Sequence, residues 1–257
     1  MTTHKYIKGT IADGLATLSI NKPPYNVLDI ETMRELNAAL DQLRHDGNAR
    51  VLVLTGEGEK AFSAGVEVAD HTPDKVDSMI QTFHGIFHRL RAIDIPVIAA
   101  INGAALGGGC ELALACDMAV IVSGAKIGQP EIRLGVFPPV AAVLLPRLLS
   151  PARANELLFG GASLDALEAH GLGLVNRVFP RETFRKDVLD FAQQFLGMSR
   201  AALIHTKRAI RAAAGHGFDG ALAETERIYL TELMKTEDAV EGLNSFIEKR
   251  KPQWKHR

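Results

Sequence analysis

The fold of this chain is decided by residues 95–115, IPVIAAINGAALGGGCELALA. The stretch starts as a buried strand, Ile95–Ile101, continues through the glycine-rich loop Asn102–Gly109 and ends in the helix-like run Cys110–Ala115. Three consecutive glycines at the start of a helix carry no Cβ atoms, so a ligand can approach main-chain N–H groups whose positive partial charge the helix dipole reinforces. This order predicts an α/β fold with a site for a developing oxyanion at the start of a helix.

A glycine loop before a helix also suits a phosphate group, so a dinucleotide-binding fold is the first alternative. The glycine signature of such folds, GxGxxG, belongs to an opening βαβ unit. Here Gly103 and Gly107–Gly109 do not give that spacing, and they lie well inside the chain. The spacing therefore disfavours a dinucleotide site.

Strand and helix patterns alternate through the first half of the chain, which favours an α/β core. The expected strands are Leu15–Ile20, Val51–Thr55, Pro96–Ile101 and Met118–Val122. Between them, Glu31–His45 and Lys75–Arg91 have helical spacing, and Thr72-Pro73-Asp74 is the expected cap and first-turn proline of the second helix.

From about Pro151 onward the pattern is almost wholly helical. The expected helices are Ala152–Phe159, Leu164–His170, Glu182–Leu196, Arg200–Ala214, Phe218–Met234 and Glu237–Lys249. We expect this half to pack over the core and to support contacts between subunits.

Composition excludes several classes of protein. The 257 residues, 47% hydrophobic, suffice for one large core, and a net charge of −1 provides no field for nucleic acid or an anionic membrane. No apolar run reaches the roughly 18 residues of a membrane span, and the start of the chain lacks a signal core, so we expect a cytoplasmic protein. Cys110 and Cys116 lie in an apolar stretch without the ligand spacing of a zinc site, so no metal is expected.

Two glutamates are the candidate acid and base. Glu111 lies among apolar residues, three positions after Gly108. Burying a carboxylate there is costly unless it has a hydrogen-bonding partner or a catalytic role. Glu131 follows in the turn Gly128-Gln129-Pro130-Glu131. Alone, each has an ordinary explanation, as a first-turn acid and as a solvated turn residue. Together they suit general acid–base chemistry, because like charges that share a water push their proton affinities apart.

A further amide donor is expected from another part of the chain. The best candidate is Ala61-Phe62-Ser63-Ala64-Gly65, because its small residues leave the main chain exposed. By itself this segment is as readily an ordinary turn after a strand.

Five motifs in order resemble the crotonase, or enoyl-CoA hydratase/isomerase, superfamily over nearly the whole chain. They are Asn26-Val27-Leu28, Ala61–Gly65, Ile95–Gly103, Leu106–Leu112 and Gly128–Glu131. The resemblance implies a spiral of ββα units with a helical C-terminal region. It divides the chain into a catalytic core, 1–195, and a C-terminal helical region, 196–257, and implies a homotrimer or a hexamer.

The same resemblance assigns roles by motif. It places the oxyanion donors on the N–H groups of Ala64 and Gly108 and the catalytic carboxylates on Glu111 and Glu131, acting on a coenzyme A thioester without further cofactor or metal. It places contacts to the substrate and to CoA on Asn26, Val27, Leu28, Ser63, Gly65, Val66, Glu67, Val68, Gly107, Pro138 and Pro139. Having both acids favours hydration of a double bond.

One departure bears on the substrate. Many family hydratases carry Pro-Gly-Ala-Gly-Gly where this chain has Pro138–Ala142, and Pro139 adds a ring and removes an N–H. Residues 128–136, 71–74 and 229–249 look most like family members that hydrate cyclohexa-1,5-diene-1-carbonyl-CoA, which is the predicted substrate. The alternatives are a short-chain enoyl-CoA hydratase, an enoyl-CoA isomerase, or a non-catalytic RNA-binding protein. Neither the charge balance nor the 6% aromatic content supports the last.

Overall fold

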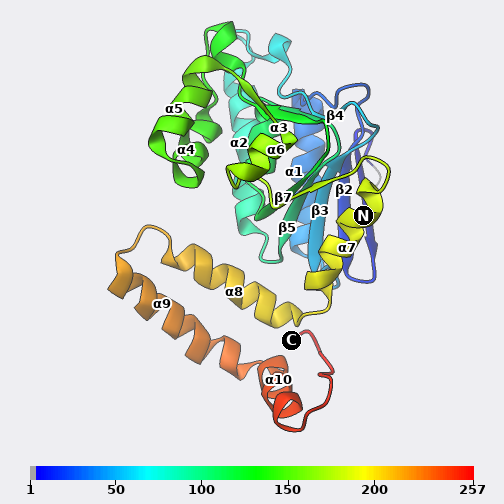
Figure 1. Cartoon of the computed structure of the whole chain (residues 1–257), viewed down its shortest axis with the longest axis vertical. Helices are drawn as coiled ribbons and strands as arrows, with labels where there is room; N and C mark the ends of the chain where they lie inside the picture. The colour runs from blue at the N-terminus through cyan, green and yellow to red at the C-terminus, as the bar shows by residue number, and fades with distance from the viewer. Residues whose placement is uncertain (1–3) are drawn as a thin grey trace.

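A six-stranded sheet is the centre of the computed structural model, which describes residues 4–257 (Figure 1). Its strand order is β1-β2-β3-β5-β7-β10, antiparallel between β1 and β2 and parallel from β2 onward. The strands are β1 Ile7–Ala12, β2 Leu15–Ile20, β3 Val51–Gly56, β5 Val97–Ile101, β7 Met118–Val122 and β10 Arg177–Phe179. The continuously apolar β3 and β5 are buried, as expected for parallel strands covered on both faces.

A second, four-stranded sheet lies next to the first and was not predicted from the sequence. It has the order β4-β6-β8-β9, with β4 Ala61–Ser63, β6 Ala104–Leu106, β8 Lys126–Gly128 and β9 Ser163–Asp165. The long strands β3, β5 and β7 are each followed by one of its short strands and then by helical structure. This repeat is the expected spiral of ββα units.

Helices follow these strand pairs. They are α1 Ile30–Arg44, α2 Val76–Ala92, α3 Gly108–Leu114, α4 Pro139–Leu148, α5 Pro151–Gly160 and α6 Ala166–Gly171, with the 3₁₀ turns η1 Val68–Asp70 and η2 Glu131–Leu134. Asp29 caps α1 by accepting from the Thr32 N–H at 2.9 Å.

Two local predictions are wrong. Thr72 does not cap α2, because Lys75 is its N-cap and no side chain bonds there; residues 72–75 form a turn in which the Thr72 carbonyl accepts from the N–H groups of Lys75 and Val76. The expected helix Leu164–His170 begins only at Ala166. Its first residues pair with β8 instead, since the sheet edge offers them hydrogen-bonding partners.

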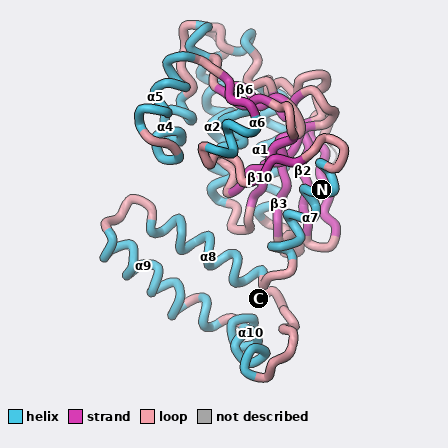
Figure 2. The backbone as a smooth tube through the Cα atoms, in the orientation of Figure 1, coloured by secondary structure: helices cyan, strands magenta, loops and turns pink. Residues whose placement is uncertain are grey.

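The first of the four C-terminal helices packs against the large sheet, and the other three extend away from the sheets (Figures 1 and 2). They are α7 Phe184–Leu196, α8 Arg200–Ala213, α9 Phe218–Thr231 and α10 Glu237–Ile247, with the 3₁₀ turn η3 Leu233–Lys235 where α9 was expected to continue. Helices α8 and α9 lie side by side. The division at residues 195 and 196 remains a prediction. None of the helices in residues 4–257 is both long and apolar enough to cross a membrane.

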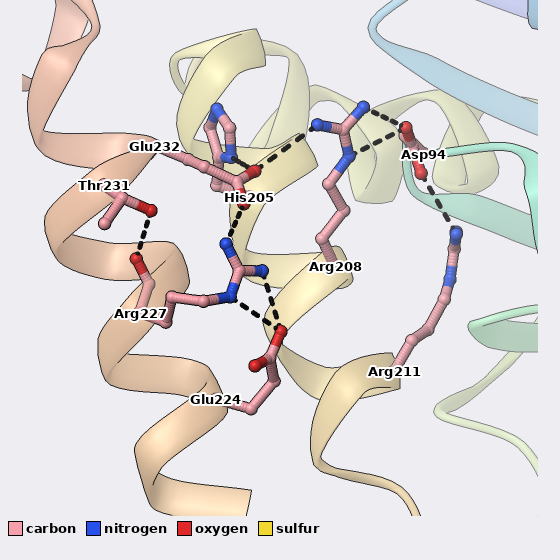
Figure 3. Close-up of polar contacts among 8 residues, drawn as sticks. All are labelled: Asp94, His205, Arg208, Arg211, Glu224, Arg227, Thr231 and Glu232. Carbon is pink, nitrogen blue, oxygen red and sulfur yellow. Dashed lines mark hydrogen bonds and ion pairs between the residues drawn. The ribbon is translucent and has the colours of Figure 1, made fainter.

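Ion pairs hold α8 against the core and against α9 (Figure 3). Arg208 and Arg211 of α8 bind Asp94, in the connection between α2 and β5, at 2.6 and 3.1 Å. On the other side, Glu232, which directly follows α9, lies 3.7 Å from Arg208 and 3.5 Å from His205 Nδ1 of α8. The orientation of α8 is therefore fixed by charged contacts as well as by packing.

Candidate active site

Glu111 lies in the first turns of α3 and is only 2% exposed. Burial raises the pKa of its carboxyl to about 7. The Ala141 N–H donates to Oε1 at 2.8 Å and opposes this rise, because it stabilises the ionised carboxylate. The helix α4 begins at Pro139, so this amide belongs to its first turn, where Pro138 offers no side-chain cap. Glu111 of α3 thus accepts from one of the main-chain N–H groups that have no partner within the first turn of α4.

Glu131 begins η2 and lies against the glycine loop. A Cβ atom on Gly107 would be 2.5 Å from Glu131 Oε1, so only glycine leaves room for this carboxylate, and Gly107 also has a positive φ of 53°. The buried Gln129 side chain faces the carboxylate. With its amide oriented so that the nitrogen points to Glu131, Gln129 donates to both carboxylate oxygens at 3.1 Å. Burial raises the pKa of Glu131, whereas its own main-chain N–H and the charge of His71 lower it.

The two carboxylates influence each other. The negative charge of Glu131 contributes to the raised pKa of Glu111, after the larger effect of burial. Because both acids are driven toward the protonated form, the pair favours holding a proton near neutral pH. One group can therefore accept a proton while the other donates one.

The Ala64 assignment is wrong in this structure, because its N–H donates to the Tyr25 carbonyl oxygen at 2.9 Å. Val66, two residues later, has an N–H with no acceptor among residues 4–257. It is held in place by its neighbours, since Leu28 N–H donates to the Gly65 carbonyl oxygen and Glu67 N–H donates to that of Leu28. Val66 is the better donor candidate.

Gly108 supplies the other unpaired N–H, again within the described residues, at the start of α3. A Cβ atom on Gly108 would lie 2.8 Å from Val66 Cγ2, and one on Gly65 would lie 3.2 Å from the Gly108 nitrogen. The Val66 and Gly108 segments are therefore in contact. Two unpaired amides this close can hold one oxygen that gains negative charge.

The predicted ligand-contacting residues separate into two groups. Asn26, Leu28 and Ser63 have no exposed surface. The prediction that they contact CoA directly is therefore wrong, and they shape the surrounding loops instead. The Asn26 amide donates to the carbonyl oxygens of Glu57 and Ala61, and the Ser63 hydroxyl donates to that of Asn26. Gly65, Gly107 and Pro138 are buried beside the site, whereas Val27, Val66, Glu67, Val68 and Pro139 keep exposed surface.

Sequence reasoning missed several residues of the site. Val66 was expected to contact the substrate but not to be an amide donor, and Gln129, Ala141 and His71 were not assigned roles. Gln129 could have been noticed as a polar residue two positions before a candidate acid. The Ala141 contact had no signal in the sequence, because it depends on how α4 packs against α3.

Known proteins are similar to this chain over most of its length. The family model described as enoyl-CoA hydratase/isomerase matches residues 10–257. The chain belongs to the enoyl-CoA hydratase/isomerase family. As a member of this family, it is similar to the cyclohexa-1,5-dienecarbonyl-CoA hydratase of Thauera aromatica, with 35% identity over 95% of this chain and 93% of the relative.

Other members of the family are equally similar. The crotonyl-CoA hydratase of Syntrophomonas wolfei is 36% identical, over 92% of this chain and 93% of the relative. The crystal structure of an enoyl-CoA hydratase from Bacillus anthracis superposes with a TM-score of 0.94 and 32% identity, covering 98% of this chain and 100% of that one. The expected crotonase-like fold is therefore confirmed.

Proposed function

We propose that this enzyme adds water across the α,β double bond of an acyl-CoA thioester, with Glu111 and Glu131 as its acid–base pair. The observation that carries the proposal is the placement of two carboxylates with raised pKa values, Glu111 buried and Glu131 partly buried, beside two main-chain N–H groups that have no partner among residues 4–257. The named hydratases among the relatives support the same reaction class.

In the proposed reaction, the thioester oxygen accepts from the N–H groups of Val66 and Gly108. The ionised carboxylate takes a proton from water as the water oxygen bonds to the β-carbon, and electrons of the double bond move toward the thioester to form an enolate. The protonated carboxyl then delivers its proton to the α-carbon, so the product has gained one water. Each amide contributes about 3 kcal/mol at the transition state, and each proton transfer roughly 10²- to 10⁴-fold. The enolate charge is held by main-chain amides, so the proposal requires no cofactor beyond the CoA thioester itself.

For the substrate, we propose a cyclic dienoyl-CoA, with a linear short-chain enoyl-CoA as the alternative. The Thauera aromatica relative and the replacement at Pro139 support the ring substrate. The similarity to the crotonyl-CoA hydratase supports the linear one, and identities of 35% and 36% do not separate them.

The test is to incubate the purified enzyme with crotonyl-CoA and with cyclohexa-1,5-diene-1-carbonyl-CoA and to follow the loss of the conjugated thioester absorbance. A larger kcat/KM for the cyclic diene is expected. A larger kcat/KM for crotonyl-CoA would show that the enzyme prefers a linear enoyl-CoA. Hydration of neither, with isomerisation of a 3-enoyl-CoA instead, would overturn the proposed reaction.

We also propose self-association into a trimer or hexamer through the C-terminal helices. Large apolar side chains are exposed there, including Phe218 at 79% and Phe246 at 85%. Ultracentrifugation of the wild type and of a Phe246→Asp variant tests this, and a monomeric wild type would exclude it. A cytoplasmic location also stays a prediction.

A further inference from the structure

A cavity lies between α7 and the large sheet, away from Glu111 and Glu131. We call it the sheet–α7 cavity. Its volume is about 480 Å³, which is within the range of small-molecule sites. It is lined by residues of β2, β3, β5 and β7, by residues 56–59 and by residues of α7. None of the residues that form the candidate active site belongs to this lining.

Strand register explains why these side chains meet. Thr17 of β2 is paired with Val53 of β3, and Ser19 with Thr55, so alternate residues point to one face of the sheet. Arg181, Phe184, Arg185, Val188 and Leu189 close the cavity from the other side, with the spacing of one helical face. The cavity lies toward the carboxyl ends of parallel strands, a common place for ligands in α/β sheets.

Two hydroxyl groups inside the cavity have no partner. Ser19 is only 7% exposed, yet neither its hydroxyl nor that of Thr17 makes a hydrogen bond within the described part of the chain. By contrast, the nearby Thr55 hydroxyl donates to the Ala100 carbonyl oxygen at 2.8 Å. Both hydroxyls are therefore free to bind a polar atom of an occupant or a water.

The charges at the rim favour an anion. Arg185 makes no ion pair among residues 4–257, and Arg181 only donates to the Glu59 carbonyl oxygen at 3.3 Å. Of the two acids at the rim, Glu57 is neutralised by Lys8 at 3.4 Å, whereas Glu59 has no cationic partner among the same residues. Among these lining residues the two guanidinium groups thus outnumber the one carboxylate without a cationic partner.

We propose that the sheet–α7 cavity binds a small amphiphilic carboxylate. Its apolar body would contact Val53, Phe184 and Val188, while its head group binds Arg181 and Arg185, and the hydroxyls of Thr17 and Ser19 take up its polar atoms or an accompanying water. This proposal is independent of the reaction at Glu111 and Glu131.

The experiment is a calorimetric titration of the full-length protein with sodium octanoate, a carboxylate whose chain suits the cavity. Saturable binding is expected, weakened about tenfold, or about 1.4 kcal/mol, in an R181A/R185A double variant, because both exposed charge contacts are lost. Glu59→Gln removes the competing carboxylate and is expected to tighten binding. Lys186→Ala is the matched control, since this residue is exposed on the same helix, pairs with Asp190 and lies outside the lining.

The location and chemistry of the ligand are tested separately. Saturating acetyl-CoA is expected to leave the octanoate affinity unchanged, and 1-octanol is expected to bind more weakly than octanoate. Absence of saturable octanoate binding, equal affinity in the wild type and the double variant, or displacement by acetyl-CoA would each overturn the proposal.

Discussion

The main-chain N–H of Ala141 donates to Glu111 Oε1 over 2.8 Å, so the buried carboxylate also closes the first turn of α4. The proposed catalytic group thus has a structural role in the helix that begins with Pro139. Substitutions of Glu111 therefore have to be judged by activity and by stability together.

Glu111→Gln is expected to lower kcat by about 10²- to 10⁴-fold, because the amide cannot transfer the proton. Its oxygen can still accept from Ala141, so at acidic pH, where the Glu111 carboxyl is protonated, the melting temperature should stay close to that of the wild type. Glu111→Ala loses the proton transfer and also leaves the helix end unsatisfied, at a further cost of about 1 kcal/mol. Steady-state kinetics and thermal unfolding of both variants check this, and full hydratase activity in Glu111→Gln would rule out the assignment.

The stability of the wild type should fall as pH rises from about 5 to 8. Glu111 has its pKa raised from 4.5 to about 7 in the folded protein, so the folded state binds this proton more tightly than the unfolded chain. That stabilisation is complete below pH 4.5 and is lost as pH passes about 7, an effect of about 3 kcal/mol for this residue. Urea unfolding at several pH values is expected to show a smaller fall for Glu111→Gln. Parallel curves for the two proteins would contradict the prediction.

Gly107→Ala is expected to lower kcat strongly, because the new Cβ atom would lie 2.5 Å from Glu131 Oε1 and displace that carboxylate. Gly58→Ala is a matched control, since Gly58 also has a positive φ, 80°, but has nothing within 4 Å of the added atom. Both substitutions strain the backbone, because each glycine has a positive φ. Kinetics should separate them, and equal kcat values would show that the close approach is unimportant.

An amide-to-ester replacement at Val66 tests the reassigned oxyanion donor. It removes an N–H that has no internal partner among the described residues, so kcat should fall about 10²- to 10³-fold with little loss of stability. The same replacement at Ala64 removes the bond to Tyr25, so it should cost about 1 kcal/mol of stability and affect kcat less. The opposite pattern would restore Ala64 as the donor.

Lys207→Ala should destabilise the protein by about 1–3 kcal/mol, because it removes a charged hydrogen bond to Asp117, which itself stays solvated. Lys207 Nζ lies 2.5 Å from Asp117 Oδ2 and also donates to the Ile95 carbonyl oxygen, which joins α8 to the starts of β5 and β7. The double variant K207M/D117N should regain much of the loss. Urea unfolding measures both, and a loss below about 1 kcal/mol in Lys207→Ala would show the pair to be a minor anchor.

The sequence patterns missed β1, a six-residue strand interrupted by lysine and glycine, and every strand of three residues. β2, β3, β5 and β7 were predicted because five or six consecutive residues carry a visible apolar pattern. β4, β6, β8 and β9 have three residues each, too few for a period, and form only because neighbouring segments offer hydrogen bonds.

The sequence by itself determined the fold class, the two acids and the glycine loop around Gly108, because local pattern and residue chemistry are sufficient for these. Only the tertiary structure decided that Val66 rather than Ala64 has the unpaired N–H, and that Glu111 meets the first turn of α4. The physical reason is that the partner of a main-chain amide, and the burial that raises the pKa of a carboxyl, depend on segments distant in the sequence.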